Sequence, residues 1–459
     1  MNINFFIAAF SILVIVYFFI SLYSSKKIHN TTDYFLAGRN LGFFAVTFTL
    51  IATQLGGGFF VGMSEDAYTM GYFGIFYALS MTIGFLLLSC GFASKMQSLG
   101  VSTTAEIFQT HYKSIFLKKI ASLLSIATMS GILIGQIVAS KELFKFAFGT
   151  GFSMQVFFVF FWIFIITYTI VGGLKAVVIA DTFQVAIIIV FSWGVFLYAL
   201  LHTNSSWFLQ NALQTQHTYF SISYKDLLVL LPTLIMPALF SLIEQDLAQR
   251  FFAARSKKIA TFSALTAGIA LIACALIPVY FGMMTKINGL PLIKGASPLL
   301  YSIASVTNNI VAALIFCALI AAITSTSDSL LCAISSNIAQ DFTFSWVKIK
   351  NRLHLSQIIT CLAGISAFSL SYLFNQNVIK ILEESYTISV SALFVPLLFA
   401  YFKKDLKKNA AILSIIFGFS SFVYFKIFPL LGSSVIILGA SLIGYLIGMH
   451  TRKKPIISN

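Results

Sequence analysis

The sequence predicts an all-α, polytopic membrane protein with about thirteen transmembrane helices. Of its 459 residues, 59% are hydrophobic and 9% are charged, whereas a soluble domain has about 25% charged residues. Apolar segments of about 18 residues or more, long enough to cross a bilayer, recur along the whole chain. Only short connections separate them, so we expect residues 1–459 to form a single membrane domain.

The expected spans follow one another with few gaps. The first has no positive charge before it, and its apolar run is too long for a signal peptide, so it is expected to remain as a span. The thirteen spans are predicted near residues 4–24, 41–63, 70–93, 119–146, 152–172, 175–200, 226–250, 259–283, 308–340, 353–374, 378–401, 410–428 and 432–450.

The basic residues indicate the orientation of the chain. If the N-terminus lies outside, most of the 29 Lys and Arg residues fall in connections on the inner side, as the positive-inside rule requires. We therefore expect a multi-pass protein of the plasma or cell inner membrane with a cytoplasmic C-terminus. Anchoring to anionic lipid accounts for the net charge of +15 without a nucleic-acid partner.

Several function classes lack their sequence signals. There is no GxxxxGK[ST] phosphate-binding loop, and the five cysteines form no CxxC pair. The six histidines have no metal-ligand spacing, and no repeated filter loop of a channel is visible. The sequence therefore predicts neither an enzyme nor a cofactor other than a coupling ion.

The second expected span contains the stretch ATQLGGGFFVG, residues 52–62. Three successive glycines weaken a helix, and the freed backbone groups are tolerated only where protein or a water-filled cavity satisfies them. Close helix packing is the alternative, because small residues also let backbones approach. Gln54 before the glycines, and Glu65 and Asp66 beyond them, favour a binding site.

The seventh expected span, 226–250, contains Pro232 and Pro237, and each removes a helical hydrogen bond. A simple kink is the alternative interpretation. Two interrupted spans that lie five spans apart are, however, the sequence pattern of an inverted-repeat transporter.

The stretch 321–341 places Ala322, Ser325 and Thr326 on one helix face. Hydroxyl and carbonyl oxygens suit a small hard cation, although such hydroxyls also bond back to their own helix. Asp328 adds a carboxylate at the same depth.

A further acid, Asp181, follows the pair Gly172-Gly173, which is expected to make a tight turn between two spans. A carboxylate inside the membrane needs a partner or a cation. The alternative to a cation site is an ion pair with Lys175.

Together these elements resemble the sodium:solute symporter family. The matching motifs occur in family order between residues 33 and 341: DYFLAGR at 33–39, Gly172 to Ala176 followed by Asp181 and Gln184, Gln249-Arg250 followed by Ala253 to Ser256, and Ala321 to Ser329.

The resemblance implies a LeuT-like core, an inverted repeat of two five-helix halves that works by alternating access. The first helix and a cytoplasmic loop would occupy residues 1–40, the first repeat 41–200, the second repeat 226–401 and two C-terminal helices 410–450. It also implies sodium as the coupling ion. Its ligands would be the carbonyls of Ala52, Leu55 and Ala322 and the hydroxyls of Ser325 and Thr326, with Asp181 close behind.

The residues expected around the solute differ from those of two branches of the family, the proline-transporting and the sugar-transporting relatives. Gln54 stands where proline-transporting relatives have an aspartate, and Phe59, Ala78, Met81 and Pro237 stand where sugar-transporting relatives have polar residues. The run Gly56 to Phe59 looks most like the choline-transporting branch. The expected substrate-binding residues are Gln54, Gly56, Gly57, Gly58, Phe59, Phe240 and Gln245, with Glu244 and Asp246 as the nearest acids.

This lining suits a compact solute that needs few hydrogen bonds. A small amino acid, a betaine or a choline-like amine is favoured, and free helix amides at the breaks could hold a carboxylate. Two alternatives stay open: symport of another small molecule, such as a carboxylate or vitamin, and a substrate-binding sensor on the same fold without net transport.

Overall fold

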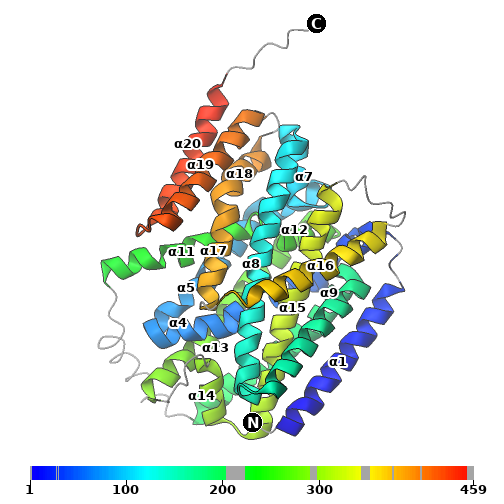
Figure 1. Ribbon diagram of the computed structural model, residues 1–459, viewed down its shortest axis with the longest axis vertical. Helices are drawn as coiled ribbons and strands as arrows, with labels where there is room; N and C mark the ends of the chain where they lie inside the picture. Colours follow the sequence, from blue (N-terminus) through cyan, green and yellow to red (C-terminus); the bar gives the residue numbers. More distant parts are fainter. Residues whose placement is uncertain are drawn as a thin grey trace.

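The computed structural model describes residues 3–26, 28, 30–202, 223–289, 297–342, 352–374, 377–403 and 406–451. Apart from an isolated bridge between Leu41 and Ala254, the regular secondary structure of these residues is helical. The helices form a bundle in which α1 (Ile3–Ser25) lies at the edge, and α19 (Lys408–Ile427) and α20 (Ser433–His450) form a pair at the C-terminal end (Figure 1). Residues 201–225 and 284–307, which connect expected spans, lie partly outside the described residues.

The remaining helices follow the apolar segments of the sequence. In chain order they are α2 (Thr31–Leu36), η1 (Ala37–Arg39), α3 (Phe43–Gln54), η2 (Gly58–Gly62), α4 (Met63–Met70), η3 (Gly71–Ile75), α5 (Phe76–Leu87), η4 (Leu88–Phe92), α6 (Ala93–Ser98), α7 (Thr104–Tyr112), α8 (Ile115–Phe148), α9 (Phe152–His202), α11 (Tyr224–Ser241), α12 (Gln245–Ala253), α13 (Lys257–Ile287), α14 (Pro298–Val306), α15 (Asn309–Asp341), α16 (Arg352–Ser371), α17 (Val378–Ser389), η5 (Val390–Phe394) and α18 (Val395–Phe402).

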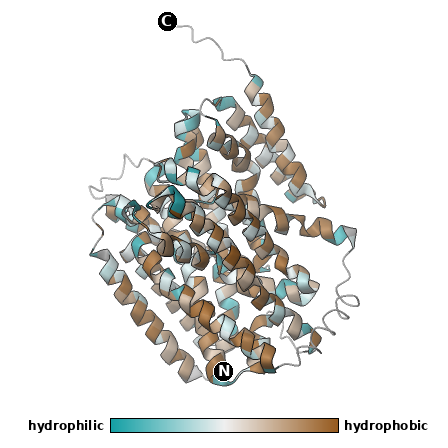
Figure 2. Cartoon of the chain, turned by 180° about the vertical axis from the view of Figure 1, so that it is seen from behind, coloured by the Kyte–Doolittle hydropathy of each residue, from teal (hydrophilic) through white to brown (hydrophobic). Residues whose placement is uncertain are grey.

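Eleven helical segments among the described residues are long and apolar enough to cross a membrane. Hydrophobic residues cover much of these segments (Figure 2). The segment Phe152–His202 contains two of the spans expected from the sequence, and Phe43–Gln54 is a shorter apolar helix. The chain is therefore a multi-pass membrane protein, while the count of thirteen spans and the inverted repeat stay predictions.

The expected turn at Gly172-Gly173 divides α9 into two helices. Gly173 has φ 53° and ψ −163°, a backbone conformation that favours glycine. A Cβ atom there would lie 2.6 Å from the ring of Tyr34, whose hydroxyl donates a hydrogen bond to the carbonyl of Ile170 at 3.1 Å. The DYFLAGR element and the double glycine thus pack against each other.

Helix α15 lies at the centre of the bundle and packs against α1, α3, α8, α9 and α16. It is the most deeply buried of the candidate spans. Because its polar stretch 324–329 is surrounded by other helices, the side chains of that stretch face protein. This position brings α15 against the interrupted helix α3.

Candidate functional site

The first break in a membrane helix lies at Leu55 and Gly56. Helix α3 ends at Gln54, and helical structure resumes at Gly57. A Cβ atom on Gly56 would lie 2.5 Å from the hydroxyl oxygen of Thr326 and 2.8 Å from Oε1 of Gln136. Only glycine therefore allows α8 and α15 to approach the break this closely.

Side chains from those two helices satisfy backbone groups near the break. The amide of Gly57 donates to Oε1 of Gln136 at 2.7 Å, and the hydroxyl of Thr326 donates to the carbonyl of Thr53 at 2.8 Å. A membrane-embedded break needs such partners, because lipid offers none. Gly57 and Gly58 are also packed closely, against Ala139 and Leu382 respectively.

The second break lies between α11 and α12, and its position corrects the prediction. Helix α11 continues through Pro232 and Pro237 to Ser241 and breaks at 242–244, after both prolines. The amide after the second proline, Ala238, donates to the hydroxyl of Ser80 at 2.9 Å. The helix tolerates the prolines because a neighbouring helix takes up a hydrogen bond, and Glu244 becomes the N-cap of α12.

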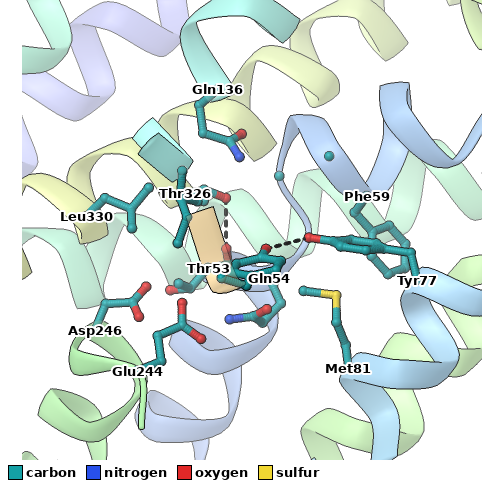
Figure 3. Close-up of a pocket in the computed structure, with 14 residues that line it drawn as sticks. Thr53, Gln54, Phe59, Tyr77, Met81, Gln136, Glu244, Asp246, Thr326 and Leu330 are labelled. Atoms are coloured by element: carbon teal, nitrogen blue, oxygen red, sulfur yellow. Dashed lines mark hydrogen bonds between the residues drawn. The ribbon is translucent and has the colours of Figure 1, made fainter. Parts of the chain in front are cut away.

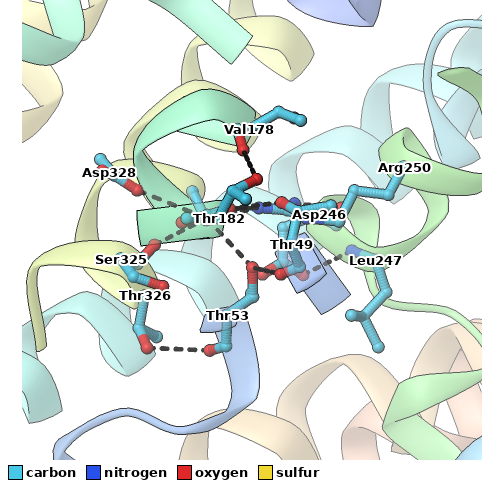
Figure 4. Close-up of polar contacts among 12 residues, drawn as sticks. Thr49, Thr53, Val178, Thr182, Asp246, Leu247, Arg250, Ser325, Thr326 and Asp328 are labelled. Atoms are coloured by element: carbon cyan, nitrogen blue, oxygen red, sulfur yellow. Dashed lines mark hydrogen bonds and ion pairs between the residues drawn. The ribbon is translucent and has the colours of Figure 1, made fainter. Parts of the chain in front are cut away.

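The predicted sodium ligands are buried at the contact of α3 with α15. Ala52, Leu55, Ala322 and Ser325 are completely buried, and Thr326 is 6% exposed. The hydroxyl oxygen of Thr326 lies 3.2 Å from the carbonyl oxygen of Ala322. The structure therefore brings hydroxyl and carbonyl oxygens from both helices to one place (Figure 4).

Two atoms at this place have unused hydrogen-bonding capacity. The hydroxyl of Ser325 lies within hydrogen-bonding reach of the Asp181 carboxylate. Beyond this contact, neither that hydroxyl nor Oδ1 of Asp181 has a hydrogen-bond partner among the described residues. Hard oxygen donors with unused capacity fit a small cation such as sodium.

Arg250 completes the surroundings of Asp181 and was missed as a site residue. Its guanidinium lies 3.7 Å from Oδ2 of Asp181, and both side chains are completely buried. It also donates to the hydroxyl of Thr49 at 2.9 Å and to the hydroxyl of Ser329, while Thr49 donates to Asp181. Arg250 is therefore enclosed by protein inside the bundle.

The partner of Asp181 in this structure is therefore Arg250 rather than the Lys175 considered from the sequence. An available signal was the Gln249-Arg250 pair, which places a charge that is always protonated within a largely apolar span. Such a charge inside a membrane protein is a sign of function. Asp328 is buried nearby on α15, and its Oδ2 has no hydrogen-bond partner in the described part of the chain.

A small cavity with a volume of about 20 Å³ lies between the two breaks. In Figure 3, Gln54, Glu244 and Asp246 lie in the lower part of the view, Phe59 and Tyr77 on the right and Gln136 at the top. The lining residues are Thr53, Gln54, Gly56, Gly58, Phe59, Tyr77, Met81, Ile132, Gln136, Glu244, Asp246, Thr326, Leu330 and Tyr386.

Four of the expected substrate-binding residues line this cavity, namely Gln54, Gly56, Gly58 and Phe59. Phe240 lies behind it, with its ring stacked on that of Tyr386 at 4.8 Å between centroids. Gly57 contributes its amide to Gln136 at the same break.

Gln245 faces another part of the protein. Its Oε1 accepts from the amide of Thr104 at 2.6 Å, and its Nε2 donates to the carbonyl of Ser102 at 3.3 Å. It thereby ties α12 to the segment before α7. This segment is further held by Thr103, which donates to Asp341 at 2.8 Å, and by Lys118, whose ammonium lies 3.3 Å from Asp341.

Sequence reasoning missed Tyr77, Gln136 and Tyr386. The hydroxyls of Tyr77 and Tyr386 are hydrogen-bonded at 2.8 Å although 309 residues separate them. Each lies in a span without a local motif, so only the packing of α5, α8 and α17 around the breaks reveals it.

Comparisons with known proteins agree with this arrangement. The sodium:solute symporter family model matches residues 34–418. A solved structure of a substrate-bound, outward-open Na+-coupled sialic acid symporter is similar, with a TM-score of 0.82, 18% identity and 99% of each chain covered.

Two further solved structures share the fold. Mhp1, a nucleobase-cation-symport-1 family transporter, has a TM-score of 0.59 and 12% identity, with 90% of this chain and 93% of that chain covered. MhsT in complex with L-phenylalanine has a TM-score of 0.53 and 17% identity, with 88% and 97% covered. These neighbours are LeuT-fold transporters, and the family match spans most of the sequence. The chain therefore belongs to the sodium:solute symporter family.

Proposed function

We propose that this protein is a secondary active transporter that couples the inward movement of sodium to the uptake of a small organic solute by alternating access. One observation carries the proposal: two broken helices face a common buried cavity, and one of them contacts α15 through oxygen-rich groups. Freed backbone groups beside a buried cavity are typical of ion and solute sites in transporters.

Sodium would be held by the carbonyls of Ala52, Leu55 and Ala322 and by the hydroxyls of Ser325 and Thr326. The buried hydroxyl of Ser325, which has no neighbour other than the Asp181 carboxylate in hydrogen-bonding reach among the described residues, supports this assignment. The Asp181 carboxylate would add negative charge nearby, partly offset by Arg250. Binding of sodium would link the two helices on which these ligands lie, and the solute cavity shares Gly56 and Thr326 with this region.

The solute would occupy the cavity between the breaks. Its lining of glycines, apolar side chains and a few amides and acids favours a small amino acid, a betaine or a choline-like amine. The distribution of basic residues supports an external N-terminus and a cytoplasmic C-terminus. Membrane lipid is the expected surrounding partner, and a carboxylate or vitamin is the alternative class of solute.

Uptake into proteoliposomes tests the proposal. Purified protein is reconstituted with potassium inside, and a panel of labelled amino acids, betaine, choline, carboxylates, vitamins and sugars is offered with sodium or potassium outside. We expect uptake of a compact solute with external sodium only, abolished when an ionophore collapses the sodium gradient.

Protein-free liposomes provide the control for leakage. Solute binding to the protein without uptake would favour the sensor interpretation, because a sensor binds its ligand without moving it. Uptake that is equal in sodium and potassium would contradict sodium coupling.

A further inference from the structure

Two carboxylates project into the cavity from the second break. Glu244 is 7% exposed and Asp246 is 1% exposed, and both side chains point toward the space beside Gln54 (Figure 3). Oδ1 of Asp246 accepts from the amide of Leu247 at 2.8 Å, and its Oδ2 is buried. The Glu244 side chain is a close neighbour of the Asp246 carboxylate and of the Gln54 amide. The cavity therefore contains two adjacent acidic side chains.

No basic side chain balances this pair within the cavity lining. Arg250 is the nearby cation, but its guanidinium bonds to the hydroxyls of Thr49 and Ser329 and to the backbone carbonyl of Asp246. Its carboxylate partner is Asp181. Two adjacent buried carboxylates are costly unless a proton or a cation neutralises them, and a cationic solute would supply that positive charge.

One helix amide at each break is already used. At the first break the amide of Gly57 donates to Oε1 of Gln136 at 2.7 Å. At the second break the amide of Leu247 donates to the carboxylate of Asp246 at 2.8 Å. A solute carboxylate in the cavity would also be repelled by the Glu244 and Asp246 carboxylates, which disfavours amino acids and betaines.

The opposite wall of the cavity is apolar and aromatic. Phe59, Tyr77, Met81 and Tyr386 line it, and the two tyrosine hydroxyls are engaged with each other. Such a wall suits a short hydrocarbon body, and ring faces also attract a cation.

We propose that Glu244 and Asp246 form an ammonium-binding subsite and that the solute is a compact organic cation with at least one N–H donor. The proposal rests on the transport function above and, among its favoured solutes, selects the amines over the amino acids and betaines. Carboxylate oxygens accept hydrogen bonds from a protonated amine, and these charge-assisted bonds are strong. A quaternary ammonium has no N–H to donate, so a choline-like solute should bind less tightly than a primary amine of similar size.

A series of four-carbon probes tests the proposal on the full-length protein in nanodiscs. The thermal midpoint is measured in sodium or potassium with butylammonium, 1,4-diaminobutane, 4-aminobutanoate, butanoate or 1-butanol, and with tetramethylammonium as a cation without N–H. A ligand that binds only the folded state raises the midpoint. We expect butylammonium or 1,4-diaminobutane to stabilise the protein most, tetramethylammonium and 4-aminobutanoate less, and butanoate and butanol not at all.

Glu244→Gln and Asp246→Asn remove the charges with little change in shape. Each should weaken the apparent affinity for the stabilising amine by about tenfold or more, because each removes a charge-assisted hydrogen bond. Glu384→Gln is the matched control, since Glu384 is an acid paired with Lys426 on the periphery, and it should bind the amine like the parent.

The comparison of sodium with potassium distinguishes a failure of the ammonium subsite from a failure of sodium-coupled transport, on which the proposal rests. Suppose that sodium stabilises the protein but neither butylammonium nor 1,4-diaminobutane does, or that butanoate or butanol stabilises it equally well. Either result would overturn the ammonium subsite and leave sodium coupling intact. Absence of any difference between sodium and potassium would contradict sodium coupling itself. The comparison of probes on the parent protein remains decisive even if one of the variants fails to fold.

Discussion

The guanidinium of Arg250 lies 3.7 Å from the carboxylate of Asp181 at the centre of the membrane protein, and neither side chain is exposed. The pair links α12 to the second half of α9, beside the predicted sodium ligands of α3 and α15. Charge at this depth is retained only when it is paired and hydrogen-bonded. The same pair therefore supports the fold and sets the electrostatic potential near the ion.

Removing one member of this pair should destabilise the protein more than removing both. Asp181→Asn or Arg250→Met leaves a buried charge without its partner, at a cost of about 3–5 kcal/mol. The double variant leaves no orphan charge and should regain part of the loss. Thermal midpoints measured in potassium, where sodium binding does not contribute, check this. Losses that simply add in the double variant would show that the two side chains are not coupled.

Gly56 should be the most sensitive glycine of the first break for ion and solute binding. In Gly56→Ala the new methyl group would lie within 2.8 Å of both Thr326 and Gln136. Overpacking of this kind costs about 1–3 kcal/mol, and it displaces groups of both predicted sites. Sodium-dependent uptake should be lost while some folded protein remains.

Gly194→Ala provides the comparison, because a Cβ atom on Gly194 meets nothing within 4 Å. That variant should transport like the parent. For Gly57 and Gly58 the structure favours a packing role as well, since added methyl groups would meet Ala139 and Leu382. Their alanine variants should lose stability together with transport. Parent-like uptake by Gly56→Ala would refute the close approach at the break.

Tyr386 should contribute to solute binding mainly through its ring. Tyr386→Phe removes the hydrogen bond to Tyr77, which is worth about 0.5–1.5 kcal/mol, but keeps the stacking on Phe240. Tyr386→Leu also removes the stacked pair, worth about 0.5–1.5 kcal/mol beyond the buried area. The KM for sodium-driven uptake should therefore rise more in the leucine variant. Equal KM values for the two variants would exclude a role for the aromatic wall.

The contacts of Asp341 with Lys118 and Thr103 should hold α7 against the bundle. Asp341→Asn removes the ion pair with Lys118 and weakens the contact with Thr103. Helix α7 should then open more often, because a charge-assisted contact contributes about 1.5–3 kcal/mol. Hydrogen exchange of residues 104–112 should accelerate. Lys426→Met, which breaks a more exposed ion pair with Glu384, should leave that exchange unchanged, and parent-like exchange in Asp341→Asn would argue against this role of the contacts.

Local sequence patterns predicted much of the fold. Apolar runs marked the membrane helices, and the glycines of 56–58 marked a true break, because glycine weakens a helix wherever it stands. The i, i+3, i+4 spacing predicted one helix face for Ala322, Ser325 and Thr326, and the Thr326 hydroxyl contacts the carbonyl of Thr53 in α3. These features depend on residues close together in the chain.

The parts that were missed depend on distant packing. The break after α11 lies at 242–244 instead of at Pro232 or Pro237, because neighbouring side chains such as Ser80 let the helix continue past the prolines. Tyr77 and Tyr386 meet across 309 residues, and no local pattern marks either of them. Gln245 was expected to bind the solute because it lies near the second break in the sequence. Its side chain instead accepts a hydrogen bond from the amide of Thr104 at the start of α7.

The sodium site on α15 is tested most directly by comparing the sodium dependence of two double variants that each remove two hydroxyls. Ser325→Ala with Thr326→Ala removes the two predicted side-chain ligands. Thr324→Ala with Ser327→Ala removes hydroxyls that bond back to the carbonyls of Ile320 and Ile323 on their own helix. Sodium is titrated against the thermal midpoint and against uptake of the solute identified in proteoliposomes. We expect the first double variant to lose its response to sodium and the second to keep the parent sodium affinity. A parent sodium affinity in Ser325→Ala with Thr326→Ala would contradict the assignment of these two residues as sodium ligands.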